Sequence, residues 1–121
     1  KRGKQMSYDD LLEFKLEKLR EIGLKHAEAK RKLAIMEHGR KILLAKLMKE
    51  KQLNKTGKEL PVNAQEREAR SDERYQNHIT TLGIAIEEEA KWAWEKKIVD
   101  INFESWKTKM INNTVEKKHY G

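Results

Sequence analysis

Apolar residues recur at alternating steps of three and four through the first half of the chain, from Ser7 to about residue 53. This spacing places them on one stripe of an α-helix and predicts a helix over residues 7–53. Ser7-Tyr8-Asp9-Asp10 resembles a capping box, with acidic side chains at the positive end of that helix. The stripe consists of Leu12, Leu16, Leu19, Ile22, Ala29, Leu33, Met36, Leu43 and Leu47.

The pattern stops at "NKTGKELPVN", residues 54–63, where Gly57 and Pro61 are strong helix breakers. We expect Asn63 to cap a second helix over residues 64–115, and a break near Ser71-Asp72 is the alternative. Two long helices and a short connection predict an all-α, coiled-coil-like antiparallel hairpin that assembles into a helical-bundle oligomer. Residues 1–6 and 116–121 would be a basic arm and a basic tail of this one domain.

The second helix carries two apolar stripes on opposite faces. At 100° per residue, the first set lies within about 40° of Trp92, and the second lies about 180–240° away from it. The second set continues toward the loop through Ile86, Leu82, Ile79 and Tyr75. One hairpin buries only one stripe, so the first set is predicted to form a subunit or partner interface, ahead of a base-stacking platform. The first set is Trp92, Val99, Phe103, Trp106 and Met110, and the second is Trp94, Ile98 and Ile101.

The formal net charge of +7 is unevenly distributed. Residues 1–60 hold 17 Lys and Arg against 9 Asp and Glu, whereas residues 61–121 hold 10 against 11. The basic residues of the first helix would either pair with the acidic second helix, as flanking charges do in coiled coils, or contact nucleic-acid phosphates without sequence preference. The candidate nucleic-acid contacts are Lys18, Lys25, Lys30, Arg31, Lys32, Lys41 and Lys46.

The residues for a catalytic site are missing from the sequence. There is no cysteine, no histidine pair at metal-binding spacing, no glycine-rich phosphate loop and no GxSxG motif. We therefore expect neither an enzyme nor a cofactor. No apolar run is long enough to cross a bilayer, and "KRGKQMSYDD" does not resemble a secretory signal, so a cytoplasmic location without membrane contact is expected.

Three stretches of the second half resemble small helical proteins encoded in bacteriophage genomes near replication and recombination functions. They are "AQEREARSDERYQ" at 64–76, "EEEAKWAWEKK" at 87–97 and "FESWKTKMINNTVEKKHYG" at 103–121. The resemblance implies a phage protein in the cytoplasm of a bacterial host. The expected function is that of a homo-oligomeric accessory protein acting through protein contacts, with sequence-tolerant nucleic-acid binding by the basic face of the first helix as the alternative.

Overall fold

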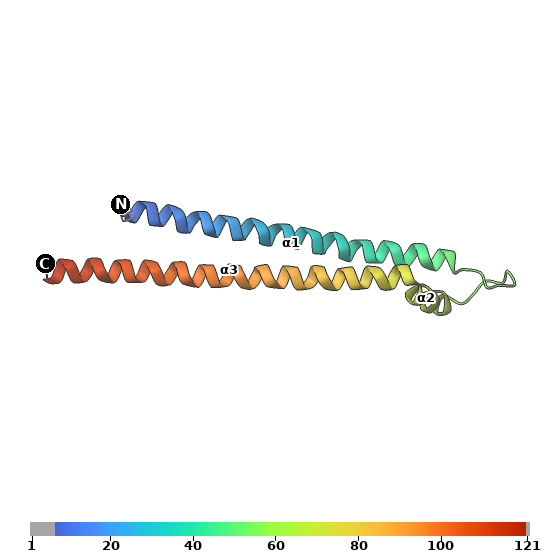
Figure 1. The fold of residues 1–121 in the computed structure, drawn as a ribbon. Helices are drawn as coiled ribbons and strands as arrows, with labels where there is room; N and C mark the ends of the chain where they lie inside the picture. The colour runs from blue at the N-terminus through green and yellow to red at the C-terminus, as the bar shows by residue number, and fades with distance from the viewer. Residues whose placement is uncertain (1–6, 121) are drawn as a thin grey trace. The chain divides into compact units, whose positions relative to one another are not determined.

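The computed structural model describes residues 7–120, with side chains as far as Val115. It contains helices α1 (Tyr8–Glu50), α2 (Val62–Ser71) and α3 (Glu73–Tyr120). Helices α1 and α3 pack against each other in antiparallel directions (Figure 1). The predicted all-α fold with two long packed helices is thus confirmed. The predicted arm at residues 1–6, and the side chains of the predicted tail at 116–121, lie outside the described residues.

Helix α1 begins where the capping pattern predicts. The backbone N–H of Asp10 donates to Oγ of Ser7 at 3.1 Å, and that of Leu11 donates to the Ser7 carbonyl oxygen at 3.0 Å. Ser7 thereby satisfies donors that the first turn of a helix leaves without intrahelical partners. The helix ends at Glu50, three residues before the predicted end.

The loop after α1 is organised by the side chain of Asn54. Its Oδ1 accepts hydrogen bonds from the backbone N–H groups of Thr56 and Lys58, each at 2.9 Å. Gly57 follows with a φ of 85°, a left-handed conformation that a side chain would disfavour. An isolated antiparallel bridge joins Leu53 to Glu59 and closes the loop. This bridge requires extended backbone at residue 53, which explains the earlier end of α1.

The structure divides the predicted second helix at Asp72, the alternative that the sequence left open. Pro61, not Asn63, is the N-cap of α2, and its carbonyl oxygen accepts from the N–H of Ala64 at 3.0 Å and of Gln65 at 2.9 Å. Asp72 has an extended ψ of 138°, and its Oδ1 accepts from the N–H of Arg74 at 2.8 Å. Asp72 therefore ends one helix and caps the next. Helix α3 then continues past residue 115 to Tyr120.

The chain forms two compact units. The terminal unit comprises residues 1–27 and 90–121, and the loop unit comprises residues 28–89. Helices α1 and α3 contribute to both units, whereas α2 belongs to the loop unit.

A small hydrophobic core holds the loop unit together. Leu47 and Ala69 are fully buried and Tyr75 is 3% exposed, so one residue from each helix meets at this point. Leu43, Leu44 and Met48 pack around them. Arg74 links the ends of α1 and α3, because its Nη2 lies 2.7 Å from Oε1 of Glu50 and 3.0 Å from Oδ2 of Asp72.

A second close approach in the loop unit involves His78 of α3 and Gly39 of α1. The Nε2 of His78 lies 2.8 Å from the Met36 carbonyl oxygen. A carbonyl oxygen only accepts, so Nε2 carries the proton in this contact. A Cβ at position 39 would lie 3.3 Å from Cε1 of His78. Gly39 thus provides the space in which the imidazole reaches the α1 backbone.

Candidate protein-interaction surface

Both long helices pack through positions that repeat every seven residues in steps of three and four. On α3 the seam runs from Tyr75 to Met110, and every position except Lys96 is buried or half-buried. A seven-residue apolar repeat is the pattern of coiled-coil packing. The α3 seam positions in the loop unit are Tyr75, His78, Leu82, Ala85 and Glu89, and those in the terminal unit are Trp92, Lys96, Val99, Phe103, Trp106 and Met110.

The five residues predicted to form the oligomer interface lie in this seam and face α1. The rings of Trp106 and Tyr8 stack with centroids 5.4 Å apart and planes at 15°, and Phe103 lies 6.0 Å from Trp106. The Nζ of Lys15 is 5.3 Å from the Trp106 ring, and that of Lys25 is 4.9 Å from the Trp92 ring. Trp92, Val99, Phe103, Trp106 and Met110 are all half-buried.

Within the terminal unit, the stripe that packs on α1 is therefore the Trp92 set, whereas the sequence pattern assigned the Trp94 set to that side. Trp94 is 62% exposed, Ile101 59% and Ile98 38%, and these three residues form the outward face. We expected the Trp92 stripe to point away from α1, and this expectation is wrong because the stripe faces α1. The physical reason is the strict seven-residue repeat, because a seam that includes Leu82 and Tyr75 reaches Trp92 and not Trp94.

Sequence reasoning missed the true seam because four of its positions carry small or polar residues. His78, Ala85, Glu89 and Lys96 do not register as core residues in a search for large apolar side chains. Ile79 and Ile86, which directly follow His78 and Ala85, do register as core residues, and the expected stripe was therefore placed on their side of the helix. A fixed seven-residue register, applied regardless of residue type, is the signal that identifies the seam.

The outward stripe presents one apolar surface. Trp94, Ile98 and Ile101 follow one another at steps of four and three, so they share one side of α3. Lys97 partly covers the indole, with its Nζ 5.8 Å from the Trp94 ring. Single exposed apolar side chains are ordinary on soluble proteins, whereas contiguous ones mark interaction sites. We call these three residues the outward stripe.

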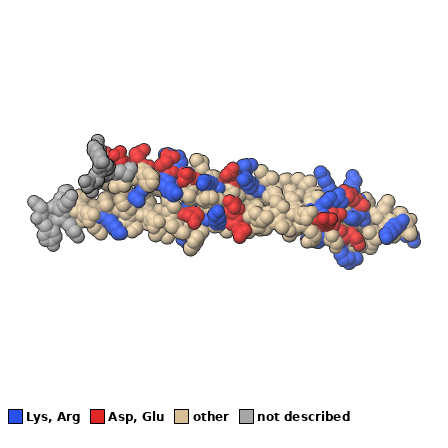
Figure 2. Space-filling view, in the orientation of Figure 1, with Lys and Arg blue, Asp and Glu red and all other residues tan. Residues whose placement is uncertain are grey.

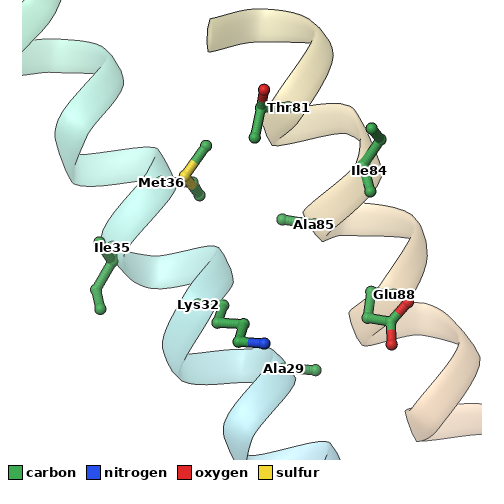
Figure 3. Close-up of a pocket in the computed structure, with 8 residues that line it drawn as sticks. All are labelled: Ala29, Lys32, Ile35, Met36, Thr81, Ile84, Ala85 and Glu88. Atoms are coloured by element: carbon green, nitrogen blue, oxygen red, sulfur yellow. The ribbon is translucent and has the colours of Figure 1, made fainter.

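The loop unit has an apolar groove of about 370 Å³ between α1 and α3. Its floor contains Ala29 and Ala85, whose small side chains leave the space open (Figure 3). Lys32 extends from α1 toward α3, and Glu88 lies on the opposite wall. Ile35 and Ile84 are 56% and 60% exposed at the groove. Met36 and Thr81 complete the lining.

The basic residues predicted to contact nucleic acid do not form one surface. At 100° per residue, Lys30 and Lys41 lie on the side of α1 opposite Lys32, and Arg31 points away from the seam. Lys18 lies 3.8 Å from Glu21, and Lys25 covers Trp92. Lys30, Arg31, Lys41 and Lys46 are exposed. On the face in Figure 2, acidic side chains are interspersed among the basic ones.

Between residues 7 and 120 no helix is both long and apolar enough to span a membrane. Within the same part of the chain, no group of three or more His, Asp and Glu residues is arranged to hold a metal ion.

Comparison with known protein families, with characterised proteins and with solved structures finds no match to this chain.

Proposed function

We propose that this protein is a non-enzymatic helical-hairpin module that acts through protein–protein contacts and self-associates through the outward stripe of α3. The single observation that carries this proposal is the exposure of Trp94, which is 62%, beside Ile98 and Ile101 on a helix whose opposite face already packs on α1. Burying a large aromatic side chain contributes substantially to association, and tryptophan is enriched at the centres of protein interfaces.

The resemblance to phage-encoded helical proteins suggests an accessory role in DNA metabolism or in inhibition of a host complex, and both remain proposals.

The test is the solution mass of the wild-type chain and of Trp94→Glu, measured by light scattering over a range of protein concentrations. We expect the wild-type chain to form dimers or larger oligomers, and Trp94→Glu to be monomeric with unchanged helix content by circular dichroism. Leu24→Glu is the matched control, because Leu24 is 66% exposed on α1 in the same unit and outside the stripe. A wild-type chain that stays monomeric at every concentration would refute the proposal.

Sequence-tolerant nucleic-acid binding is the second candidate, and one observation favours it. Lys30 and Lys41 are exposed on the same side of α1, within the more basic half of the chain. The double change Lys30→Glu with Lys41→Glu should then weaken binding to a short DNA duplex, and added salt should weaken wild-type binding steeply between about 50 and 300 mM. Unchanged affinity after the charge reversal would remove this candidate.

A further inference from the structure

We infer that two copies of this chain associate through antiparallel α3 helices, with Ile98 of each copy against Ile101 of the other. This inference rests on the proposed self-association and adds the partner, the direction and the register. Its starting point is the spacing of Trp94, Ile98, Ile101 and Ser105, which alternates between four and three residues on the exposed face of α3. Such a face can meet an identical one as a second coiled-coil seam.

The charges beside the outward stripe select one antiparallel register. When Ile98 lies opposite Ile101 of the second copy, Lys97 lies opposite Glu104 of that copy, and the two-fold symmetry repeats the pair. Both side chains are exposed, and each also has a contact in its own helix. The Nζ of Lys97 lies 5.8 Å from the Trp94 ring, and Oε2 of Glu104 lies 3.3 Å from Nζ of Lys107. In antiparallel coiled coils such flanking pairs determine partner orientation more than they add stability.

The neighbouring antiparallel registers bring like charges together. A shift of seven residues in one direction places Lys97 opposite Lys97 and Glu95 opposite Glu95. The same shift in the other direction places Glu104 opposite Glu104. Like charges across such a seam are unfavourable by roughly as much as opposite charges are favourable. The sequence of α3 therefore favours the register that pairs Ile98 with Ile101.

The direction of packing follows from Lys91 and Trp94. A parallel pair would align identical residues and place the two Lys91 ammonium groups next to each other within the seam. The antiparallel register instead places Lys91 opposite Thr108, and the large Trp94 opposite the small Ser105. Lys91, Ser105 and Thr108 are all exposed in the single chain, where the Nζ of Lys91 lies 5.0 Å from the centroid of the Trp92 ring. Alternating large and small residues across a seam fills it without voids.

The experiment is a charge swap, read as the dimer dissociation constant from sedimentation equilibrium at low salt. Lys97→Glu alone and Glu104→Lys alone should each weaken the dimer roughly tenfold, because two attractive pairs become repulsive. The double variant, Lys97→Glu with Glu104→Lys, should restore wild-type affinity. Lys96→Glu is the matched control, since it makes the same charge change one residue away, at an exposed position on the side of α3 opposite the outward stripe, and it should leave the constant unchanged.

The outcomes separate this inference from the proposed function. A dimer that Trp94→Glu disrupts, but whose affinity the double charge swap fails to restore, keeps the outward stripe as the interface and overturns the antiparallel register. A parallel dimer would respond in that way, because Glu104 would then lie near Lys109 of the second copy and not near Lys97. A wild-type chain without any self-association overturns both. Restored affinity in the double variant supports the inference.

Discussion

The terminal unit and the loop unit use the same two helices and the same seven-residue repeat, yet they are stabilised differently. In the terminal unit Ile22 is the one buried apolar side chain among the described residues, and half-buried aromatic rings make up much of the α3 side of the seam, with Trp106 stacked on Tyr8 and lysine ammonium groups over the rings. In the loop unit a few residues are buried almost completely, and polar contacts such as that of His78 with the Met36 carbonyl connect the helices.

The two units also differ in the side chains that stay exposed after the helices have packed. The loop unit gains a third helix, and Ala69 of α2 completes a core with Leu47 and Tyr75. Among the described residues the terminal unit has only two helices, so one side of α3 packs and the opposite side remains exposed with Trp94 on it. This exposed tryptophan is the reason for which we propose that a second chain packs on the terminal unit.

The largest expected effect comes from removing the fully buried leucine of the loop unit. Leu47→Ala should lower the free energy of unfolding by about 3 kcal/mol, because it removes apolar contacts and leaves a cavity beside Ala69 and Tyr75. The measurement is urea denaturation followed by circular dichroism. Leu24→Ala in the terminal unit is the control, since Leu24 is 66% exposed. Equal losses for the two variants would contradict the contrast between a concentrated core and an open surface.

An intermediate effect is expected at glycines of the two units. Gly23→Ala in the terminal unit should raise the free energy of unfolding by up to about 1 kcal/mol, because alanine favours helix and a Cβ there would have no neighbour within 4 Å. Gly39→Ala in the loop unit should not raise the free energy of unfolding in this way, since the new Cβ would lie 3.3 Å from Cε1 of His78.

Urea denaturation also tests whether the His78 ring is what makes the two glycines differ. In a His78→Ala background, Gly39→Ala should become as favourable as Gly23→Ala, because the ring that fills the space has been removed. If Gly39→Ala is equally stabilising in the wild-type protein, the close approach of His78 to α1 does not restrict position 39.

The smallest expected effect is a pH dependence that originates in the loop unit. Hydrogen bonds from Arg74 hold the pKa of Asp72 well below its usual range, and Arg74 also lowers the pKa of Glu50. A carboxyl group with a lowered folded-state pKa stabilises the fold above its ordinary pKa of about 4, and this contribution is lost as the pH falls below that value.

Denaturation midpoints measured at neutral pH and at about pH 3, below the ordinary carboxyl pKa, test this dependence. Asp72→Asn and Arg74→Gln should each be less stable than the wild-type protein at neutral pH, and the difference should narrow in acid. A constant difference across the pH range would show that the Asp72–Arg74 contact does not contribute through ionisation.

Much of the fold follows from local chemistry that the sequence displays directly. The cap at Ser7, the breakers Gly57 and Pro61, and the long periodic stretches predict two long helices and their antiparallel packing. The break at Asp72 was harder to predict, because "ARSDERY" suits both a helix interior and a helix boundary. The hydrogen bonds of Asp72 with Arg74, and of Arg74 with Glu50 in α1, act at that boundary.

Which stripe of α3 packs on α1 was not predictable from the size of side chains alone. Helix α3 has two apolar stripes, and α1 can cover only one of them. Trp92 belongs to one stripe and Trp94 to the other, on opposite sides of the helix. The polar and small seam residues His78, Ala85 and Glu89 determine which stripe is continuous with the loop unit's core, and they do not resemble core residues in the sequence. Whether the Trp92 set also contacts another chain stays a prediction.

The fluorescence of Trp94 alone measures whether association buries the outward stripe. With Trp92→Phe and Trp106→Phe, the remaining indole is the one that is 62% exposed in the single chain. As protein concentration rises and light scattering reports a larger mass, its emission should move to shorter wavelength and acrylamide quenching should fall. Emission and quenching that stay constant while the mass increases would show that the chain associates through a different surface.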